Sequence, residues 1–292
     1  MNDSYDNEFL NRARGDFLHA RFKAFMNSVW AVIAGRPNQL LSFDEVKEKL
    51  RLGGPIYGGV KTIRMDQIVG SLNRYQDFDR AFLPTQSETA ERWQRVGLAY
   101  YKDISLPPIL LYKVGQVYFV VDGHHRVSVA REQGQEFIEA EVRECAVKVN
   151  VTADHLRPED LEILSAKVDF IERTNIDRLR PGSNIKMSIP DGFERMLEHI
   201  AVHQYFMGLD EKRDISEEEA IIHWYDTVYL PIVQVIRESG ILDEFPGKTE
   251  GDLYLWVLDH AHYLAETEGQ PLLPPAEAAR EYVQTQEDPD KD

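Results

Sequence analysis

The spacing of apolar residues changes near residue 148, and this change limits the folds that the chain can adopt. Between residues 60 and 148, short runs of apolar and β-branched residues alternate with turns that contain glycine or proline. Beyond residue 148, apolar residues recur every three or four positions over long stretches, as they do in amphipathic helices. We therefore expect the α+β class, with a small α/β domain over 60–148 and an all-helical domain over 149–283.

The expected α/β domain has one helix among its strands. Strand-forming runs occur in KTIRMDQIVGS, LPPILLYKV, VYFVV and FIEAEVREC. The helix is expected directly after VYFVV and ends at Gly134.

An N-terminal helical segment is expected over residues 1–59. Residues 8–34 carry apolar positions at helical spacing, and the Gly-Arg-Pro sequence at 35–37 ends them. A second, short helix is expected after Ser42, because Ser42 with Glu45 three residues later forms a capping box.

The second half of the chain contains long helical patterns and an approximate repeat. The repeat relates HQYFMG, which begins at His203, to HAHYLA, which begins at His260, and suggests a duplicated helical hairpin. The polar residues 284–292 are expected to form a disordered tail. The helical patterns occupy residues 158–174, 193–209, 216–240 and 251–269.

The net charge of −17 is unevenly distributed. Residues 1–148 hold 20 Lys and Arg against 19 Asp and Glu, whereas residues 149–292 hold 13 against 31. Such acidity disfavours DNA as a partner unless the first half presents a local basic face, and it disfavours anionic membranes.

Three further features restrict the class of protein. Hydrophobic residues make up 43% of the chain, which is sufficient for a folded core. No run approaches the roughly 20 apolar residues of a membrane span, and residues 1–16 lack a signal-peptide core, so a cytoplasmic location is expected. Cys145 is the only cysteine, which excludes an internal disulfide and a thiolate zinc site.

The sequence DGHHR at 122–126 is the principal candidate site. If Asp122 and Gly123 form a tight turn after VYFVV, then His124, His125 and Arg126 occupy the first turn of a helix. A helix N-terminus favours anions, most often phosphate. Gly123 allows close approach of a ligand, Arg126 and His125 can donate to phosphate oxygens, and His124 can carry a proton. Asp122 is a candidate metal ligand or a carboxylate that aligns a histidine. The alternative is a helix start with two partly exposed histidines.

A second candidate element, SLNRYQDFDRAFLP at 71–84, follows the first strand of the domain. It contains Arg74 and Arg80 as candidate phosphate ligands, and Asp77 and Asp79 as candidate catalytic carboxylates. In an extended segment the two aspartates would share a face. The alternative is a loop with exposed charges and two anchored aromatic residues.

These residues resemble known families. DGHHRVSVAREQG resembles the signature of the ParB and sulfiredoxin fold, in which a Gly-x-x-Arg element at a helix start binds nucleotide phosphates. Sulfiredoxins carry a nucleophilic cysteine where this chain has His124, so their activity is not expected. Chromosome-partitioning ParB proteins match at Gly123 and Arg126 only. The free-serine kinases of this fold carry Asp-Gly-His and an arginine at the same turn, which implies small-molecule phosphoryl transfer. A group of uncharacterised bacterial proteins is similar in having RYxDFDRxFLP ahead of DGxHR.

The resulting functional expectation is a cytoplasmic nucleotide-binding protein. ATP, ADP or CTP would bind at residues 123–126, with Mg²⁺ near Asp122 and with Asp77 or Asp79 supporting phosphoryl transfer to a small-molecule acceptor or nucleotide hydrolysis. A second hypothesis is a non-enzymatic, ParB-like regulator that binds DNA or a partner. A third is an interaction protein whose site is inactive. A homo-oligomer or a protein partner would use the helical domain.

Overall fold

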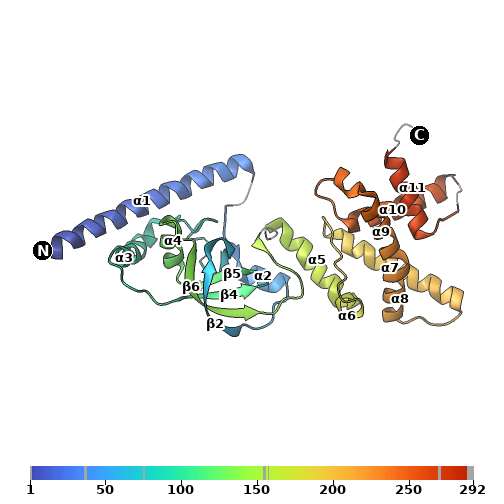
Figure 1. Ribbon diagram of the computed structural model, residues 1–292, viewed down its shortest axis with the longest axis horizontal. Helices are drawn as coiled ribbons and strands as arrows, with labels where there is room; N and C mark the ends of the chain where they lie inside the picture. The colour runs from blue at the N-terminus through green and yellow to red at the C-terminus, as the bar shows by residue number, and fades with distance from the viewer. Residues whose placement is uncertain are drawn as a thin grey trace. The chain divides into compact units, whose positions relative to one another are not determined.

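The chain forms two compact units in the computed structural model, which describes residues 2–35, 38–74, 76–153, 156, 158–268 and 271–287. Contacts between residues separate Met1–Leu161 from Glu162–Asp292. The first, termed the α/β unit, contains a mixed six-stranded sheet, and the second, termed the helical unit, is built of helices (Figure 1). The mixed α/β character predicted from the sequence is confirmed at this level.

The sheet has the strand order β1-β3-β5-β4-β6-β2. Strands β1, β3 and β5 run parallel, β5 and β4 form an antiparallel hairpin, β4 and β6 run parallel, and β2 pairs antiparallel with β6. The hairpin turns at Gly115, whose φ of 59° lies in the left-handed region that favours glycine. The strands are β1 (Leu41–Ser42), β2 (Ile56–Arg64), β3 (Ile68–Ser71), β4 (Ile109–Val114), β5 (Val117–Asp122) and β6 (Phe137–Cys145).

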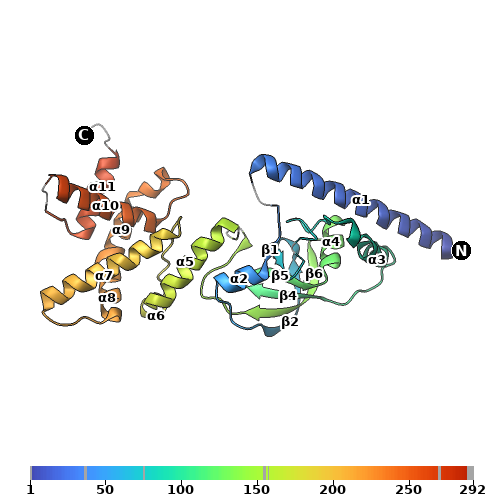
Figure 2. The same cartoon turned by 180° about the vertical axis from the view of Figure 1, so that it is seen from behind.

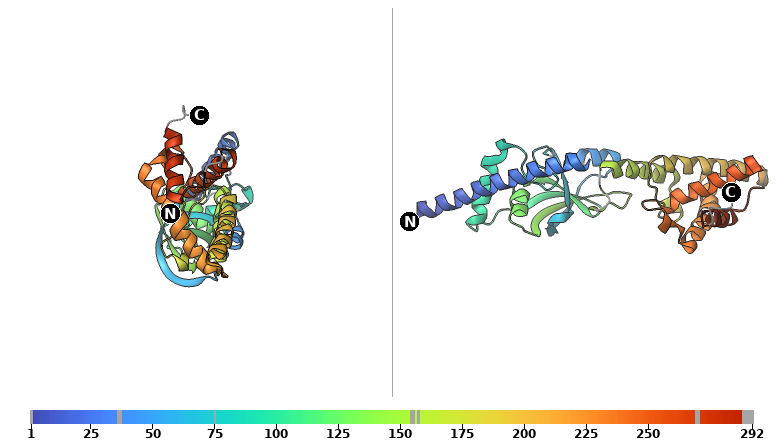
Figure 3. Two further views of the ribbon diagram at one scale, coloured as in Figure 1. Left: turned by 90° about the vertical axis from the view of Figure 1, so that its right-hand side faces the viewer. Right: turned by 90° about the horizontal axis from the view of Figure 1, so that it is seen from above.

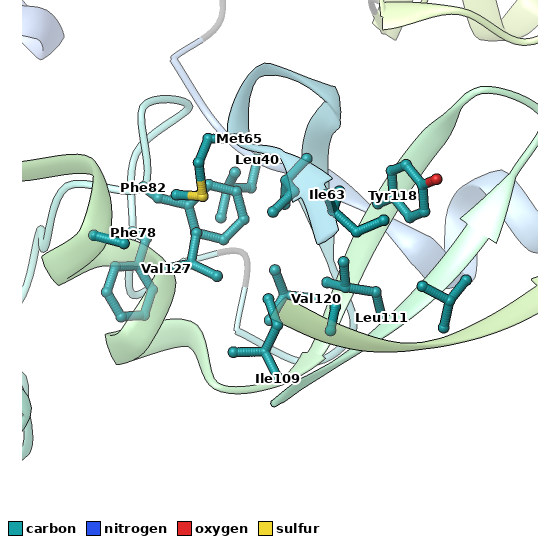
Figure 4. Close-up of a cluster of buried hydrophobic side chains, with 14 residues drawn as sticks. Leu40, Ile63, Met65, Phe78, Phe82, Ile109, Leu111, Tyr118, Val120 and Val127 are labelled. Atoms are coloured by element: carbon teal, nitrogen blue, oxygen red, sulfur yellow. The ribbon is translucent and has the colours of Figure 1, made fainter. Parts of the chain in front are cut away.

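One apolar core connects the sheet with the helix that follows β5. That helix is α4 (His124–Glu132), and the loop between β3 and the next helix also contributes side chains (Figure 4). Phe78 and Phe82 of this loop are almost fully buried, so the loop is part of the core and not a surface connection. The labelled members of the cluster are Leu40, Ile63, Met65, Phe78, Phe82, Ile109, Leu111, Tyr118, Val120 and Val127.

The N-terminal helix α1 (Asn2–Ala34) packs on the α/β unit along α3 (Ala90–Tyr101), and the views in Figure 3 show the two helices side by side. The Phe17 and Trp93 rings lie 5.6 Å apart, and the Trp93 indole N–H donates to Ser128 Oγ at 2.8 Å. These contacts join α1, α3 and α4 in one layer. The short helix α2 (Phe43–Lys49) begins as predicted, with Ser42 Oγ accepting from the backbone N–H of Glu45.

The predicted boundaries at 59 and 148 differ from the division observed. The segment over 1–59 is not separate, because α1 packs on α3, β1 pairs with β3 and β2 already begins at Ile56. Past 148, the Val151 carbonyl accepts from the Gln116 N–H at 2.8 Å, which holds the chain against the β4–β5 turn. The turn that was expected to end the first helix includes residues 36 and 37, which lie outside the described residues.

The helical unit follows the predicted helical patterns (Figure 2). Helix α5 crosses the boundary between the units. The predicted helix over 216–240 contains a π-helical turn, Tyr225–Tyr229, just before Pro231, which lacks an N–H and crowds the carbonyl four residues earlier. The helices are α5 (Pro158–Thr174), α6 (Ile176–Leu179), α7 (Asp191–Glu211), α8 (Glu217–Trp224), α9 (Leu230–Ser239), α10 (Glu250–Glu268) and α11 (Pro275–Glu287).

The first residues of the predicted C-terminal tail are helical. Residues 284–287 of the predicted tail continue α11, and residues 288–292 lie outside the described residues. None of the described helices combines the length and the apolarity that crossing a membrane requires.

Candidate functional site

The turn from β5 into α4 has the geometry predicted for the DGHHR motif. Gly123 adopts φ 96° and ψ 22°, and His124 begins the helix. A Cβ at position 123 would lie 2.4 Å from Ile109 Cγ2, so both the left-handed backbone and the packing against β4 require glycine. The first N–H groups of an α-helix have no intrahelical acceptor, so their chemistry at this turn suits an anion.

His124 is buried at the back of this turn and supports the loop that follows β3. Its Nε2 lies 2.7 Å from Ser71 Oγ at the end of β3, and its ring stacks against Phe78. Burial, followed by the nearby positive charge of Arg74, lowers the pKa of His124 to about 4. The imidazole is therefore neutral near pH 7.

His125 has buried ring nitrogens that lack a protein partner. Neither Nδ1 nor Nε2 forms a hydrogen bond with any of the described residues. Burial and the positive charges of Arg74 and Arg92 lower the pKa of His125 to about 4. A neutral imidazole with unsatisfied polar atoms is costly to bury, and a ligand that hydrogen-bonds with it would remove that cost.

Two adjoining cavities, of about 390 and 370 Å³, open beside His125 and share Arg74, Arg92 and His125 in their walls. We term the combined cavity the arginine hollow. The first part is also lined by Asp77, Gln86, Glu88 and Thr89. The second part is also lined by Arg95, Val96, Leu106, Pro107, Asp122, Gly123, His124 and Arg126.

The four arginines of the hollow differ in how far their donors are engaged. Arg74 pairs with Asp77 at 3.4 Å, and Arg95 pairs with Glu91 on its own helix. Arg92 forms neither a hydrogen bond nor an ion pair with the described part of the chain. Because both histidines are neutral, the positive charges of the hollow are those of its arginines, and Asp77, Glu88 and Asp122 carry negative charge in the same walls.

Arg126 holds a neighbouring segment in place. Its guanidinium donates to the carbonyls of Pro107 and Pro108 in the connection between α3 and β4, and to Asp122 Oδ2 at 2.6 Å. The predicted phosphate donor therefore already has protein acceptors. Asp122 is paired with it and is 75% exposed, and its negative charge favours the protonated form of His124.

Asp77 and Asp79 do not share a face, contrary to the expectation from an extended segment. The chain turns at 76–82, so Asp77 lines the arginine hollow whereas Asp79 is buried in its own loop. Asp79 Oδ1 accepts from the N–H groups of Ala81 and Leu83 at 2.9 and 2.8 Å, and Oδ2 accepts from Asn27 at 2.9 Å. Asp79 thus stabilises the loop and its contact with α1.

Arg80 also lies apart from the hollow. Its side chain is exposed, and its backbone N–H donates to the Asn38 carbonyl at 3.0 Å. Tyr75 of the same motif lies outside the described residues. The structure therefore brings seven of the nine predicted site residues around one hollow and separates Asp79 and Arg80 from it.

Helix α3 contributes two arginines to the hollow that were not among the predicted site residues. Arg92 and Arg95 lie three residues apart on this helix, so they project from one face. That spacing was visible in the sequence, but it does not show which surface the face meets. Trp93 decides this, because its buried indole and its hydrogen bond to Ser128 fix α3 against α4.

The residues present do not form a dedicated metal cage. No group of three or more His, Cys, Asp or Glu within the described ranges is arranged to hold a metal ion. Mg²⁺ that arrives with a nucleotide needs only one or two protein carboxylates, because phosphate oxygens and waters complete its octahedron. Both Asp77 and Asp122 line the hollow, and Asp77, which is 35% exposed, fits that requirement better than Asp122, which is 75% exposed.

No protein-family model matches the chain, and comparison with curated proteins yields no match. The resemblance to the ParB and sulfiredoxin fold consequently depends on residues 71–84 and 120–134 and on the order of strands around them.

Proposed function

We propose that the α/β unit binds a nucleotide, with the phosphates in the arginine hollow at the N-terminus of α4. The observation that carries this proposal is the pairing of unused donors in one cavity. Arg92 has no described partner, and both nitrogens of the neighbouring His125 are buried without one. A phosphate placed between Arg92 and His125 would accept hydrogen bonds from the guanidinium and from the ring N–H of the imidazole. Arginine suits phosphate oxygens because its planar fork donates two parallel hydrogen bonds.

A second cavity supports a ligand with an apolar or planar body. It measures about 270 Å³ and shares Val96, Leu106, Pro107 and Arg126 with the arginine hollow. Tyr100, Ile104, Ile109, Phe137 and Ile138 make most of its surface apolar, while Gln135 and Glu139 add hydrogen-bonding groups. A nucleobase has these properties, a flat ring with polar edges, so a nucleotide uses both cavities and free phosphate uses one.

Within this proposal the reaction is phosphoryl transfer to a small alcohol or to water. Asp77 would orient the acceptor hydroxyl and receive its proton as the phosphoryl group leaves the nucleotide. Mg²⁺ bound to the phosphates would neutralise charge during transfer, and Glu88, the other carboxylate in the same part of the hollow, would be available to hold it while Asp77 receives the proton. His124 would have a positioning role through its contact with Ser71.

The test is a thermal unfolding series with ATP, ADP, CTP and GTP, each with Mg²⁺. A nucleotide at 100 times its Kd stabilises the native state by about 2.7 kcal/mol, which is several degrees in Tm. We expect one nucleotide to raise the Tm of the wild type, and Arg92→Ala and Arg74→Ala to reduce or abolish the rise. Arg80→Ala is the matched control, because it removes an arginine of the same motif that lies outside the hollow.

The opposite result is equally clear. If no nucleotide raises the Tm of a well-folded sample, the proposal is wrong. A rise that Arg92→Ala and Arg74→Ala leave unchanged would place the nucleotide elsewhere on the chain. Arg126→Ala is a poor probe, because it also releases the carbonyls of Pro107 and Pro108.

The alternative of a regulator that contacts a partner is favoured by one observation, the exposed apolar surface of α1. That surface belongs to the α/β unit and not to the helical unit that the sequence suggested for protein contacts.

A further inference from the structure

Helix α1 has two apolar sides, and only one of them is covered. Ala13, Phe17, Ala20 and Ala24 are buried on the side that meets α3. The opposite side, termed the α1 outer face, carries eight apolar residues that are between 36% and 82% exposed. These residues are Leu18, Phe22, Phe25, Met26, Val29, Trp30, Val32 and Ile33.

The spacing within the outer face is that of a helix-pairing seam. Leu18, Phe22, Phe25, Val29 and Val32 follow one another at intervals of four, three, four and three residues. This is the heptad repeat of paired helices, in which a second helix inserts its side chains between those of the first. Two heptads are too few to hold an isolated pair of helices together. Here α1 is already kept helical by its packing on α3. Contacts along the seam therefore need to stabilise only the association of the two helices and not their folding.

The charges around α1 favour an uncharged occupant. No Asp or Glu occurs between Asp16 and Asp44. Of the lysines and arginines that the structure describes in this stretch, Lys23 binds Glu132 at 3.2 Å and Arg21 donates to the Thr85 carbonyl. Among residues 17–35, these two cations are therefore already paired within the α/β unit, and the outer face itself consists of uncharged residues, so two copies of it would meet without like-charge repulsion.

The area of the outer face also fits a dimer. At about 200 Å² for each aromatic side chain, Phe22, Phe25 and Trp30 alone expose on the order of 400 Å². The eight residues together expose roughly 800 Å², which is about what each partner buries in an interface of standard size. A patch of this size is larger than monomeric proteins usually leave in water.

We propose that the α1 outer face packs against the same face of a second copy of this chain, so that the protein is a dimer through α1. The contact is a helix pair with Phe22 and Phe25 near its centre. It does not depend on the proposed nucleotide site, because the outer face shares none of the residues that line the arginine hollow.

The test is the molar mass of the full chain in solution, measured by size-exclusion chromatography with light scattering. We expect the wild type to have twice the 33.7 kDa of a single chain, and Phe22→Glu to have the single mass with an unchanged circular dichroism spectrum. Phe25→Gln, which adds no charge and keeps helix propensity, should weaken the dimer so that its mass falls on dilution. The matched control is Phe206→Glu on α7, an aromatic residue of similar exposure that should leave the dimer intact.

Three outcomes would overturn the proposal. The first is a wild type with the mass of one chain at every concentration. The second is a dimer that Phe22→Glu and Phe25→Gln do not weaken, or that Phe206→Glu dissociates. The third is a monomer that sediments with phosphatidylglycerol and phosphatidylcholine vesicles and loses this binding in Phe22→Glu, which would identify lipid as the occupant.

Discussion

The two histidines of the DGHHR turn are held neutral in the folded protein, and this has a measurable effect on stability. The pKa of each is lowered to about 4, from an ordinary value of 6.5, with burial as the largest cause. Between these values the unfolded chain binds more protons than the native state, so acid favours unfolding. The stabilising effect is complete above pH 6.5 and is lost as the pH falls toward 4.

We expect the free energy of unfolding to decrease by about 2 kcal/mol per histidine between pH 7 and pH 5. Urea unfolding of His125→Phe at the two pH values should show a loss that is smaller by about 2 kcal/mol than that of the wild type, since one of the groups that binds a proton on unfolding is gone. His262→Gln, which removes an exposed histidine from α10, should behave as the wild type does. An equal pH dependence in all three proteins would contradict this prediction.

Gly123 provides a second prediction at the residue scale. Gly123→Ala introduces a left-handed alanine and a Cβ that overlaps Ile109, with an expected loss of about 3 kcal/mol. Gly134→Ala introduces a similar backbone strain, at φ 71°, but its Cβ meets no atom within 4 Å, so a loss of about 1 kcal/mol is expected. Urea unfolding compares the two, and equal losses would show that the packing against Ile109 contributes nothing.

At the scale of elements, the loop over 76–84 gives its two aspartates different environments: Asp79 stabilises the loop, and Asp77 lines the arginine hollow. In Asp79→Asn, an amide N–H₂ replaces one of the two carboxylate oxygens, so a donor faces either the Asn27 side chain or the backbone N–H groups that the oxygen accepted from. The substitution should lower the free energy of unfolding by about 1–3 kcal/mol. Asp77→Asn removes only a half-exposed ion pair and should change stability by less than about 1 kcal/mol.

In the proposed reaction, the rate of nucleotide turnover should depend on Asp77 more than on Asp79, the reverse of their order of effect on stability. With phosphate release as the assay, Asp77→Asn should be the slower variant and Asp79→Asn should retain activity in proportion to its folded fraction. Loss of turnover in a fully folded Asp79→Asn, with Asp77→Asn unaffected, would exchange the two roles.

The connection between α3 and β4 depends on Arg126 in the same way that the loop depends on Asp79. Arg126→Met keeps the length of the side chain and removes the donors to Pro107 and Pro108. Because hydrogen bonds from a charged group contribute about 1.5–3 kcal/mol, peptides covering residues 102–109 should exchange their amide hydrogens roughly 10 to 100 times faster. Arg95→Met is the control, since Arg95 is bonded to Glu91 of its own helix. Unchanged exchange in Arg126→Met would show that the segment is held by its apolar contacts.

Local signals in the sequence were sufficient to predict the turn at 122–126 and the strand and helix on either side of it. They were also sufficient for the cap at Ser42. They failed where pairing with distant residues decides the structure. Strand β1 has two residues and exists through its pairing with β3, and Ile56 and Tyr57 lie between glycines yet form a strand because they pair with β6. Contacts with distant residues also explain why the sequence predicted only the part of the arginine hollow that comes from residues 74–77 and 122–126. Arg92 reaches it only because Trp93 anchors α3.

At the scale of the whole molecule, each of the described apolar clusters lies within one unit, and we expect the two units to unfold separately. Clusters around the sheet and around α1 and α3 belong to the α/β unit, and the cluster of Met207, Ile215 and Ala220 belongs to the helical unit. Scanning calorimetry should therefore show two transitions, and a nucleotide that binds as proposed should raise the temperature of only one of them. A single transition that moves as a whole on binding would contradict the independence of the units.

The strand order of the sheet has a consequence for synthesis on the ribosome. Among the described strands, β2 pairs with β6 alone, and Ile56 lies opposite Glu144, 88 residues further along the chain. At about 5–20 residues per second, β2 waits roughly 4–18 seconds after its own synthesis before its partner exists. During that interval its edge hydrogen bonds are unmet and its apolar residues, Ile63 among them, lack the sheet that later buries them. The apolar residues of β2 therefore stay unburied in the nascent chain until β6, which ends at Cys145, has emerged.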